Sequence, residues 1–450
     1  MKARTASGPV LSRLSSSSLI CSQCLRHDLS NPSAVTIQSR KYRPTRRKSV
    51  SPFGAAVSAA QTIFKGLPKA PPGISVDPLR IVGKELKFLT KNIRQLLGSG
   101  HPTLDKVAKY YTRSEGKHMR PMLVLLMSQA TALTPRKSRP NTPSSPGTVN
   151  DPITAPSILA DNNPDLNPLV TSSLEAKYDF SGDENILPSQ RRLAEITELI
   201  HTASLLHDDV IDNAVTRRSS SSANLQFGNK MAVLAGDFLL GRASVALARL
   251  RDPEVTELLA TVIANLVEGE FMQLKNTAAD EKHPVFTDET IDYYLQKTYL
   301  KTASLISKSC RAAALLGDST PEVVESAYSY GRNLGLAFQL VDDMLDYTVT
   351  DAELGKPAGA DLELGLATAP LLFAWKESPE LGPLVGRKFS QEGDVQRARE
   401  LVVKCDGVEK TRQLAHEYAE KAIAAISGFP DSEAKAGLIQ MCEKTMNRRK

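Results

Sequence analysis

Leu205-Leu206-His207-Asp208-Asp209-Val210-Ile211-Asp212 and Leu340-Val341-Asp342-Asp343-Met344-Leu345-Asp346 are the two most informative stretches of this 450-residue chain. Each ends in the pattern D-D-x-x-D and closes a run of apolar residues at helical spacing. Three carboxylates within about one helical turn repel one another unless cations neutralise them. Two such clusters, far apart in the sequence, predict one site for hard divalent cations. Carboxylate oxygens without His or Cys favour Mg²⁺, which commonly bridges protein and phosphate.

The periodicity around these clusters predicts an all-α protein. From Arg191 almost to the C-terminus, apolar residues recur at three- and four-residue steps, and alternating strand patterns are scarce. We therefore expect a helical bundle around one large core. Asp208 and Asp212 share a helix face because they are four residues apart, and the same holds for Asp342 and Asp346. If the two helices face each other, their carboxylates converge on a cavity between them.

Residues 76–450 are predicted to form one domain. Helical patterns cover residues 77–97, begin again near Thr103 and include 122–133, before residues 134–189, which are dense in Pro, Ser, Asn and Asp. Such a segment buries too little apolar surface to offset the entropy lost on ordering. We interpret residues 134–189 as a disordered insertion, because helical periodicity resumes directly after it.

The N-terminal part has a different composition. Residues 1–50 contain ten Lys and Arg and one acidic residue, so the remainder of the chain carries about −3 although the whole chain is +6. A body of this charge gives no support to nucleic-acid binding. The Arg- and Ser-rich stretch predicts a mitochondrial transit peptide and linker over residues 1–75, with the mature protein in the matrix. The alternative is a basic tail without a targeting role.

Cysteine spacing and hydropathy add little. Cys21 and Cys24 form C-x-x-C inside the predicted presequence, without the second pair that a zinc site would need. The most apolar stretch, 232–250, is interrupted by Asp237, Arg242 and Arg249. We therefore predict no membrane-spanning segment.

Basic residues accompany the acidic clusters. Lys117 and Arg120 lie in Gly116-Lys117-His118-Met119-Arg120-Pro121, and Arg217-Arg218 follow the first cluster closely. Lys301-Thr302 and Gly355-Lys356 come later in the chain. One such residue would be an ordinary surface charge. Together with two metal-binding clusters, they are the cations that two diphosphates require.

The chain resembles the long-chain trans-polyprenyl diphosphate synthases of the mitochondrial ubiquinone pathway. The matching segments follow the family's order and lie at 116–121, 205–218, 227–230, 234–237, 301–303, 338–346 and 355–361. The resemblance implies an isoprenoid-synthase-type helical bundle around a large central cavity. It also implies a prenyltransferase that adds isopentenyl diphosphate units in trans to an allylic diphosphate, by Mg²⁺-assisted ionisation, condensation and elimination.

The resemblance assigns a role to each matching position. Asp208, Asp212 and Asp342 would ligate three Mg²⁺ ions, supported by Asp209, Asp343 and Asp346. The allylic diphosphate would be bound by Arg217, Lys301 and Lys356. The isopentenyl diphosphate would be bound by Lys117, Arg120, His201 and Arg218. Thr302 and Gln339 would direct oxygens toward the allylic cation. The catalytic set is then Asp208, Asp212, Lys301, Thr302, Gln339 and Asp342. Without the resemblance, His201 would be read as a neutral core histidine.

Helix geometry also addresses product length. Ala203 and Ser204 precede Asp208 by five and four residues, about one turn deeper along the helix. In short-chain family members an aromatic residue at this level stops the tail. Two small residues predict an open tunnel and a product of the hexaprenyl to decaprenyl class. The alternative is that they merely permit tight helix packing. Gly331 and Gly335 indicate either the close approach of another helix or a local kink.

Three further points remain open in the sequence. The family continues Arg-Arg with a Gly- and Pro-containing turn, whereas 219–224 reads S-S-S-S-A-N, which leaves the conformation of this loop undetermined. A terpene cyclase is one alternative class of enzyme, because it also ionises a diphosphate with an acidic cluster. It would not need Lys117 and Arg120 for a second diphosphate, nor two equal clusters. A non-catalytic or co-catalytic subunit of a heteromeric synthase is the other alternative.

We expect a homodimer or heteromer, with peripheral contact to the inner mitochondrial membrane.

Overall fold

The computed structural model describes residues 77–97, 99, 101–111, 118–137, 183–217, 220–275, 284–348 and 360–448. The chain divides into two compact units, Met1–Gly66 and Leu67–Lys450. The first unit lies outside the described residues, as do Lys117, Arg218, Lys356 and residues 138–182 of the predicted insertion. The fold described below is therefore that of the second unit.

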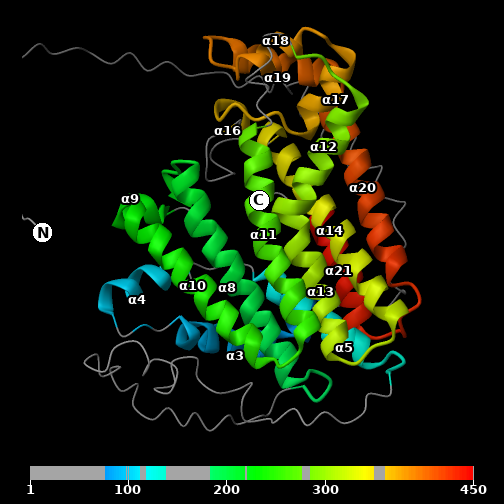
Figure 1. The fold of residues 1–450 in the computed structure, drawn as a ribbon. Coiled ribbons are helices and arrows are strands. Elements are labelled where there is room, and N and C mark those ends of the chain that lie inside the picture. Colours follow the sequence, from blue (N-terminus) through cyan, green and yellow to red (C-terminus); the bar gives the residue numbers. More distant parts are fainter. Residues whose placement is uncertain are drawn as a thin grey trace, which may run out of the picture. The chain divides into compact units, whose positions relative to one another are not determined.

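The described elements are almost all helices (Figure 1). The first half contains α2 (Pro78–Ile81), α3 (Gly83–Leu96), α4 (Pro102–Ala108), α5 (Met119–Ala132), α8 (Pro188–Ile211), strands β1 (Thr216–Arg217) and β2 (Ser220–Ser221), α9 (Ala223–Phe227) and α10 (Asn229–Arg249). The second half contains α11 (Pro253–Lys275), α12 (Asp288–Thr298), the π-helical turn η1 (Tyr299–Ala303), α13 (Ser304–Leu316), α14 (Pro321–Thr348), α16 (Ala360–Glu363), α17 (Ala369–Glu377), α18 (Leu381–Gly386), α19 (Asp394–Lys404), α20 (Gly407–Ala425) and α21 (Glu433–Met446). The predicted all-α class is confirmed.

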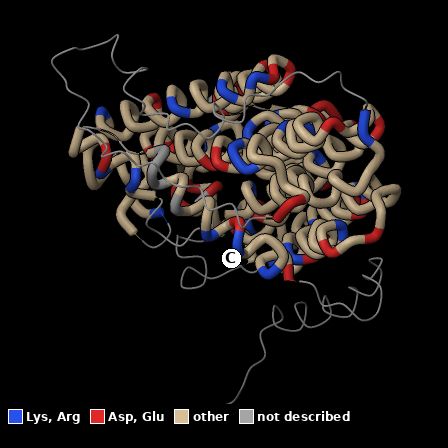
Figure 2. The backbone as a smooth tube through the Cα atoms, turned by 90° about the horizontal axis from the view of Figure 1, so that it is seen from below, with Lys and Arg blue, Asp and Glu red and all other residues tan. Residues whose placement is uncertain are grey.

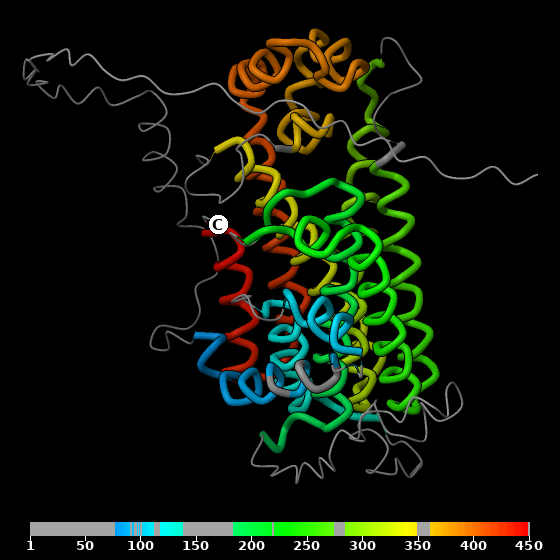
Figure 3. Tube along the Cα trace, turned by 90° about the vertical axis from the view of Figure 1, so that its left-hand side faces the viewer, coloured from blue at the N-terminus to red at the C-terminus, as the bar shows by residue number. Residues whose placement is uncertain are grey.

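The core lies between the long helices. α14 packs on α13 and α20, α13 packs on α5, α8 and α11, and α8 packs on α10. The buried side of α8 includes Leu193, Ile196, Leu199 and Ile200, each at most 1% exposed. Figures 1 and 3 both place α17, α18 and α19 at one end of these long helices. Acidic and basic residues are interspersed over the described helices (Figure 2).

Both described ends of the predicted insertion, 134–137 and 183–189, contact the helices. The Lys137 amide donates to the Asp318 carbonyl at 2.7 Å, next to a β-bridge between Arg136 and Ser319. On the far side, the Gln190 side chain accepts from the Leu187 amide at 2.8 Å and donates to the Ala313 carbonyl at 2.8 Å. These bonds tie the N-terminus of α8 to the end of α13.

α10 differs from the sequence-based expectation. The sequence predicted no membrane-spanning stretch, yet α10 is long and apolar enough by length and composition, with a mean hydropathy of 1.5 over its best window. Of that window, 44% is buried inside the fold, where α10 packs on α8. The three interrupting charges did not lower the mean hydropathy enough for the expectation to hold.

The two glycines of α14 lie at a close helix contact. A Cβ added to Gly335 would lie 2.6 Å from the Ala303 Cα, and one added to Gly331 would lie 2.7 Å from the Ser307 Cα. Real Cβ atoms do not approach backbone this closely. Of the two readings of these glycines, the structure therefore supports close approach, which brings α14 against η1 and α13.

Gly335→Ala should lower the free energy of unfolding by about 1–3 kcal/mol, because the new methyl group meets backbone that cannot move aside. It should also reduce activity, since Ala303 belongs to the same turn as Lys301 and Thr302. The matched control is Gly241→Ala in α10, where a Cβ meets nothing within 4 Å. That variant should be unchanged or up to about 1 kcal/mol more stable. Urea unfolding checks both, and equal effects would contradict the close-contact account.

Candidate active site

Both acidic clusters lie at the C-terminal ends of helices. Asp208 and Asp209 are in the last turn of α8, and Asp212 is its C-cap residue. The second cluster occupies the last turns of α14. The C-terminus of a helix carries the negative end of its dipole, so carboxylates are unfavourable there. Each helix end therefore favours bound cations.

Burial divides the six aspartates into two sets. Asp209, Asp343 and Asp346 are 0%, 2% and 1% exposed. Asp208, Asp212 and Asp342 are partly exposed, so solvent and ligands can reach them. Within the described part of the chain, no group of three or more His, Cys, Asp or Glu side chains is gathered closely enough to hold one ion. The donor set consists of hard oxygens and suits Mg²⁺ that shares its coordination with phosphate.

The π-helical turn η1 lies between the two clusters and carries Lys301 and Thr302. Lys301 Nζ lies 2.6 Å from Glu270 Oε2 and donates to Gln273 Oε1 at 3.1 Å. Thr302 Oγ1 donates to Gln339 Oε1 on α14 at 2.8 Å. A Cβ on Gly269 would lie 2.9 Å from the Lys301 amide nitrogen, so this glycine lets α11 approach η1. Turns of this type occur often at functional sites.

The electrostatics of Asp208 join α8 to η1 and α11. Burial, together with the charges of Glu270 and Asp212, raises the pKa of Asp208 to about 6, although Lys301 and Arg217 lower it in part. Burial likewise raises the pKa of Asp212. Without a bound cation, the ionised cluster is thus less favourable in the folded chain than in the unfolded one.

Asp208→Asn should raise the free energy of unfolding in EDTA at pH 8 by about 1–3 kcal/mol, while abolishing activity. The folded pKa, about 6, exceeds the unfolded value of 3.8. The stability that the protonated carboxyl provides is therefore complete below the unfolded pKa and is lost as the pH rises through about 6. The gain in the free energy of unfolding from Asp208→Asn should therefore be about half as large at pH 5 as at pH 8.

Asp431→Asn is the matched control, because the Asp431 side chain is 96% exposed. It should change stability by no more than about 0.5 kcal/mol at either pH. A stabilisation by Asp208→Asn that does not depend on pH would contradict the burial argument.

Side chains and backbone from several helices contact the second cluster. Asp343 accepts hydrogen bonds from Tyr294 Oη at 2.6 Å, Gln339 Nε2 at 2.9 Å and the Ala369 amide at 3.3 Å. Burial raises the pKa of Asp343, and these hydrogen bonds lower it in part. Asp342 Oδ1 forms an ion pair with Arg448 Nη1 at 2.6 Å. The end of α21 therefore reaches the site.

Predicted diphosphate-binding residues also meet. Arg120 on α5 and His201 on α8 lie 2.9 Å apart through Nη1 and Nε2. Arg217 Nε donates to Asp209 Oδ1 at 2.5 Å, which leaves the two terminal nitrogens of the guanidinium for a ligand. Lys117, Arg218 and Lys356 lie outside the described residues, so their predicted roles stay predictions.

Arg217 belongs to the first of two short antiparallel strands. Strands β1 and β2 pair Thr216 with Ser221 and Arg217 with Ser220. The Ser222 hydroxyl donates to the Ala214 carbonyl at 2.5 Å, and the Ser222 amide donates to the Val215 carbonyl at 3.0 Å. Ser220 and Ser221 thus pair with the strand that carries Arg217, although the family's Gly and Pro are missing from this segment.

The predicted chain-length residues, of which Ser204 is half-buried, lie near the C-terminal end of α8. Ala203 is 0% exposed. The Ser204 hydroxyl donates to the His201 carbonyl at 2.9 Å, one turn back along the helix. Both residues lie about one helical turn before Asp208, toward the N-terminus of α8.

Several residues at the site were missed by sequence reasoning. The pattern Gly269-Glu270-Phe271-Met272-Gln273 contains an acid and an amide three residues apart, which could have indicated a shared helix face. The others come from distant elements with no local pattern; they are Tyr111, Tyr294 and Arg448.

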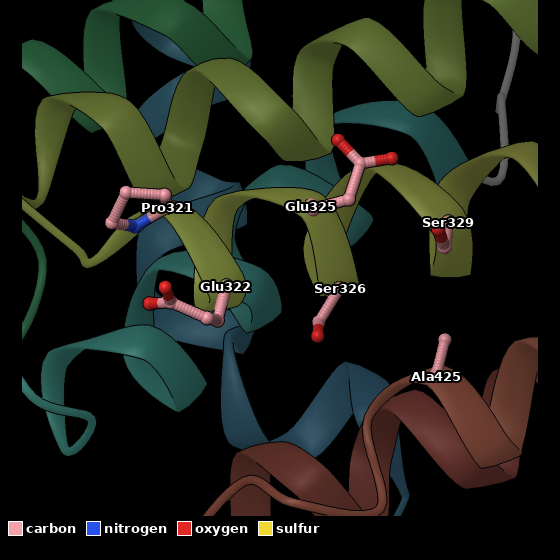
Figure 4. A pocket seen from close by; sticks show the side chains of 6 residues that line it. All are labelled: Pro321, Glu322, Glu325, Ser326, Ser329 and Ala425. Atoms are coloured by element: carbon pink, nitrogen blue, oxygen red, sulfur yellow. The ribbon is translucent and has the colours of Figure 1, made fainter.

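A hollow elsewhere on the fold does not involve this site. It has a volume of about 510 Å³ and lies between the start of α14 and the end of α20 (Figure 4). Its lining residues are Pro321, Glu322, Glu325, Ser326, Ser329 and Ala425, none of which was predicted as a site residue.

An all-α bundle in which two long helices end in acidic clusters and a π-helical turn carries Lys301 and Thr302 defines an isoprenoid synthase. The model of the family described as polyprenyl synthetase matches residues 167–402. The "probable hexaprenyl pyrophosphate synthase, mitochondrial" of Neurospora crassa is 65% identical over 92% of this chain and 92% of its own length. "Decaprenyl-diphosphate synthase subunit 1" of Schizosaccharomyces pombe is 50% identical over 82% of this chain and 91% of its own.

Solved structures agree with this assignment. A polyprenyl synthase from Caulobacter crescentus, crystallised with calcium and isoprenyl diphosphate, has a TM-score of 0.66 and 27% identity. The match covers 85% of this chain and 100% of that one. The chain belongs to the polyprenyl synthetase family. It is a mitochondrial trans-polyprenyl diphosphate synthase of the ubiquinone pathway, a prenyltransferase in a Mg²⁺-dependent family.

Proposed function

We propose that the two acidic clusters and η1 form one catalytic centre that joins isopentenyl diphosphate to an allylic diphosphate. The observation that carries this proposal is the linkage of the three parts. Lys301 acts on the charges of Asp208 and Asp212, while the adjacent Thr302 donates to Gln339, three residues before Asp342. Groups from α8, η1 and α14 can therefore act on one substrate.

Asp208, Asp212 and Asp342 would hold three Mg²⁺ ions. Their partial exposure and their position at helix C-termini support this assignment. Bound Mg²⁺ would neutralise the allylic diphosphate and so make it a good leaving group. Asp209, Asp343 and Asp346, which are buried, would support the site.

The basic residues would bind and orient the two diphosphates. Lys301, Arg217 and Lys356 would contact the allylic diphosphate and offset its charge as the C–O bond breaks. Arg120, His201, Lys117 and Arg218 would hold the isopentenyl diphosphate. The 2.9 Å contact between Arg120 and His201 places two of these groups together. Holding both substrates in reach converts a bimolecular reaction into an effectively unimolecular one.

Thr302 and Gln339 would stabilise the allylic cation through their oxygens. The isopentenyl double bond then attacks the cationic carbon, and loss of a proton to the released diphosphate restores a double bond. The bundle must exclude water, which would otherwise capture the cation. The buried apolar side chains of α8 and α14 support such a surrounding.

The protein beginning at residue 76, given Mg²⁺, farnesyl diphosphate and labelled isopentenyl diphosphate, should yield a ladder ending in one long polyprenyl product. Ala203→Phe should shorten that product by several units, because an aromatic side chain about one turn below Asp208 blocks the growing tail. Chromatography of the dephosphorylated products checks this. An unchanged product length in a folded Ala203→Phe protein would contradict the open-tunnel hypothesis.

Ala203→Leu serves as the graded control, and it should give an intermediate length. Loss of total incorporation without shorter products would report misfolding instead of a blocked tunnel. The length of the wild-type product distinguishes a hexaprenyl from a decaprenyl synthase, the two activities named for the fungal relatives.

The second candidate is a subunit of a heteromeric synthase. The observation in its favour is the name of the Schizosaccharomyces pombe relative, which is described as subunit 1. The retention of all six cluster aspartates favours a catalytic chain in either case. Incorporation by the purified chain alone would exclude a required partner.

We further propose that α10 and α11 form an interface with a second copy of the chain. Large apolar side chains are exposed on both helices, with Leu234 at 58% and Phe271 at 61%. Met231, Val233 and Val267 extend the same exposed apolar set. Burial of such residues against a partner would be favourable. A related subunit could use the same face.

Leu234→Glu should convert the dimer to a monomer, because the charge would be buried in the interface. Val403→Glu is the matched control, since Val403 on α19 is also exposed, at 53%, but lies on another helix. Sedimentation velocity checks both variants. A dimer that survives Leu234→Glu would contradict this interface.

Two cellular features complete the proposal. Residues 1–75 would act as transit peptide and linker, and residues 76–450 as the catalytic domain. Peripheral contact with the inner membrane would let the apolar product leave the site. Its support is the chemistry of a long polyprenyl chain, which water solvates poorly.

A further inference from the structure

The middle aspartate of each D-D-x-x-D cluster has the same type of environment. Asp209 and Asp343 are 0% and 2% exposed. Each accepts one hydrogen bond from a tyrosine hydroxyl that another segment supplies. Each accepts a second from a side chain with a proposed role in the reaction. The middle aspartates of the two clusters thus have the same types of hydrogen-bond donor, although the clusters lie far apart in the sequence.

In the first cluster, the tyrosine is Tyr111, which follows α4. Its hydroxyl donates to Asp209 Oδ2, and Arg217 Nε donates to Asp209 Oδ1 at 2.5 Å. The Tyr111 oxygen also accepts from the Ala223 amide at 2.8 Å, at the start of α9. The same tyrosine therefore contacts both Asp209 and the chain that follows strands β1 and β2.

In the second cluster, the tyrosine is Tyr294 on α12. Its hydroxyl donates to Asp343 Oδ2 at 2.6 Å, and Gln339 Nε2 donates to Asp343 Oδ1 at 2.9 Å. The Ala369 amide at the start of α17 donates to Asp343 Oδ2 at 3.3 Å. Asp343 thus binds three elements at once.

This arrangement determines which way the Gln339 amide points. Gln339 turns its NH₂ group toward Asp343 Oδ1, to which it donates at 2.9 Å, and its carbonyl toward Thr302. A carbonyl only accepts, so Thr302 must donate its proton to Gln339, at 2.8 Å. The Thr302 oxygen then has only lone pairs to offer a developing positive charge.

The two tyrosines keep their protons. Burial, followed by the hydrogen bond to Asp209, raises the pKa of Tyr111. Burial and the charge of Asp343 raise the pKa of Tyr294. Both hydroxyls therefore remain donors to the carboxyl groups of Asp209 and Asp343.

We propose that Tyr111 and Tyr294 are positioning residues of the prenyl transfer reaction. Tyr111 and Asp209 orient Arg217, whereas Tyr294 and Asp343 orient Gln339 and, through it, Thr302. The middle aspartates are buried anchors and do not ligate Mg²⁺. This inference rests on the roles proposed above for Arg217, Thr302 and Gln339.

Tyr294→Phe and Tyr111→Phe in the full-length protein test the inference, because each removes one hydroxyl and keeps the ring. Tyr294→Phe should lower kcat about 10- to 100-fold, the range typical for loss of a group that orients another. Its KM for the allylic diphosphate should change by no more than about threefold. Tyr111→Phe should instead raise that KM about tenfold, because Arg217 contacts the diphosphate.

Asp342→Asn is the comparison variant for loss of a metal ligand. It should raise the half-saturating Mg²⁺ concentration and remove the increase in Tm that Mg²⁺ and inorganic diphosphate give together. Both Tyr→Phe variants should keep these two properties close to wild type. Asp343→Asn should lower kcat and keep the Mg²⁺ requirement, as Tyr294→Phe does. The reason is that the new amide NH₂ can donate to the Gln339 carbonyl and so reverse the orientation of the Gln339 side chain.

Three results would overturn the inference. The tyrosines would be merely structural if their variants lowered Tm without changing kcat or KM. The middle aspartates would be metal ligands if Asp343→Asn shifted the Mg²⁺ requirement as Asp342→Asn does. A wild-type protein without incorporation would overturn the proposed function, and with it this inference.

Discussion

Carboxylates at the C-terminal ends of two buried helices are the constraint on which the rest of this site depends. Burial, together with the neighbouring acids Glu270 and Asp212, raises the pKa of Asp208 to about 6. The negative end of each helix dipole also opposes ionisation there. Cationic groups surround the clusters in consequence. Arg217 pairs with Asp209, Arg448 pairs with Asp342, and Lys301 lowers the pKa of Asp208. A site that is unfavourable without cations is suited to binding Mg²⁺ together with a polyanionic substrate.

The bundle places the catalytic groups through close helix contacts. Gly335 and Gly269 allow α14 and α11 to approach η1, so the turn that carries Lys301 and Thr302 lies between helices that each contribute further groups. A turn held on both sides has little freedom to move, which favours a fixed geometry around the allylic carbon. The same packing removes water from the surroundings of a reactive cation. Stability and catalysis therefore depend on the same contacts.

Much of this architecture could be predicted from the sequence, because helical periodicity and the D-D-x-x-D patterns are local. The all-α class, the family and the mitochondrial location are confirmed. Arg120 with His201, and Thr302 with Gln339, were assigned common substrates, and the structure brings each pair together. The roles of these residues stay predictions. Tyr111, Tyr294 and Arg448 could not be predicted, because they reach the site only through tertiary packing. The π turn depends on the same packing, and the hydropathy of α10 was misjudged from its three charges.

The most direct measurement is a crystal structure with Mn²⁺ in place of Mg²⁺ and a non-ionising allylic diphosphate analogue, read by anomalous scattering. The account predicts metal peaks within about 2.3 Å of carboxylate oxygens of Asp208, Asp212 and Asp342, with Asp209 and Asp343 still bound to Tyr111 and Tyr294. Metal peaks coordinated by Asp209 or Asp343, or none at either cluster, would contradict it.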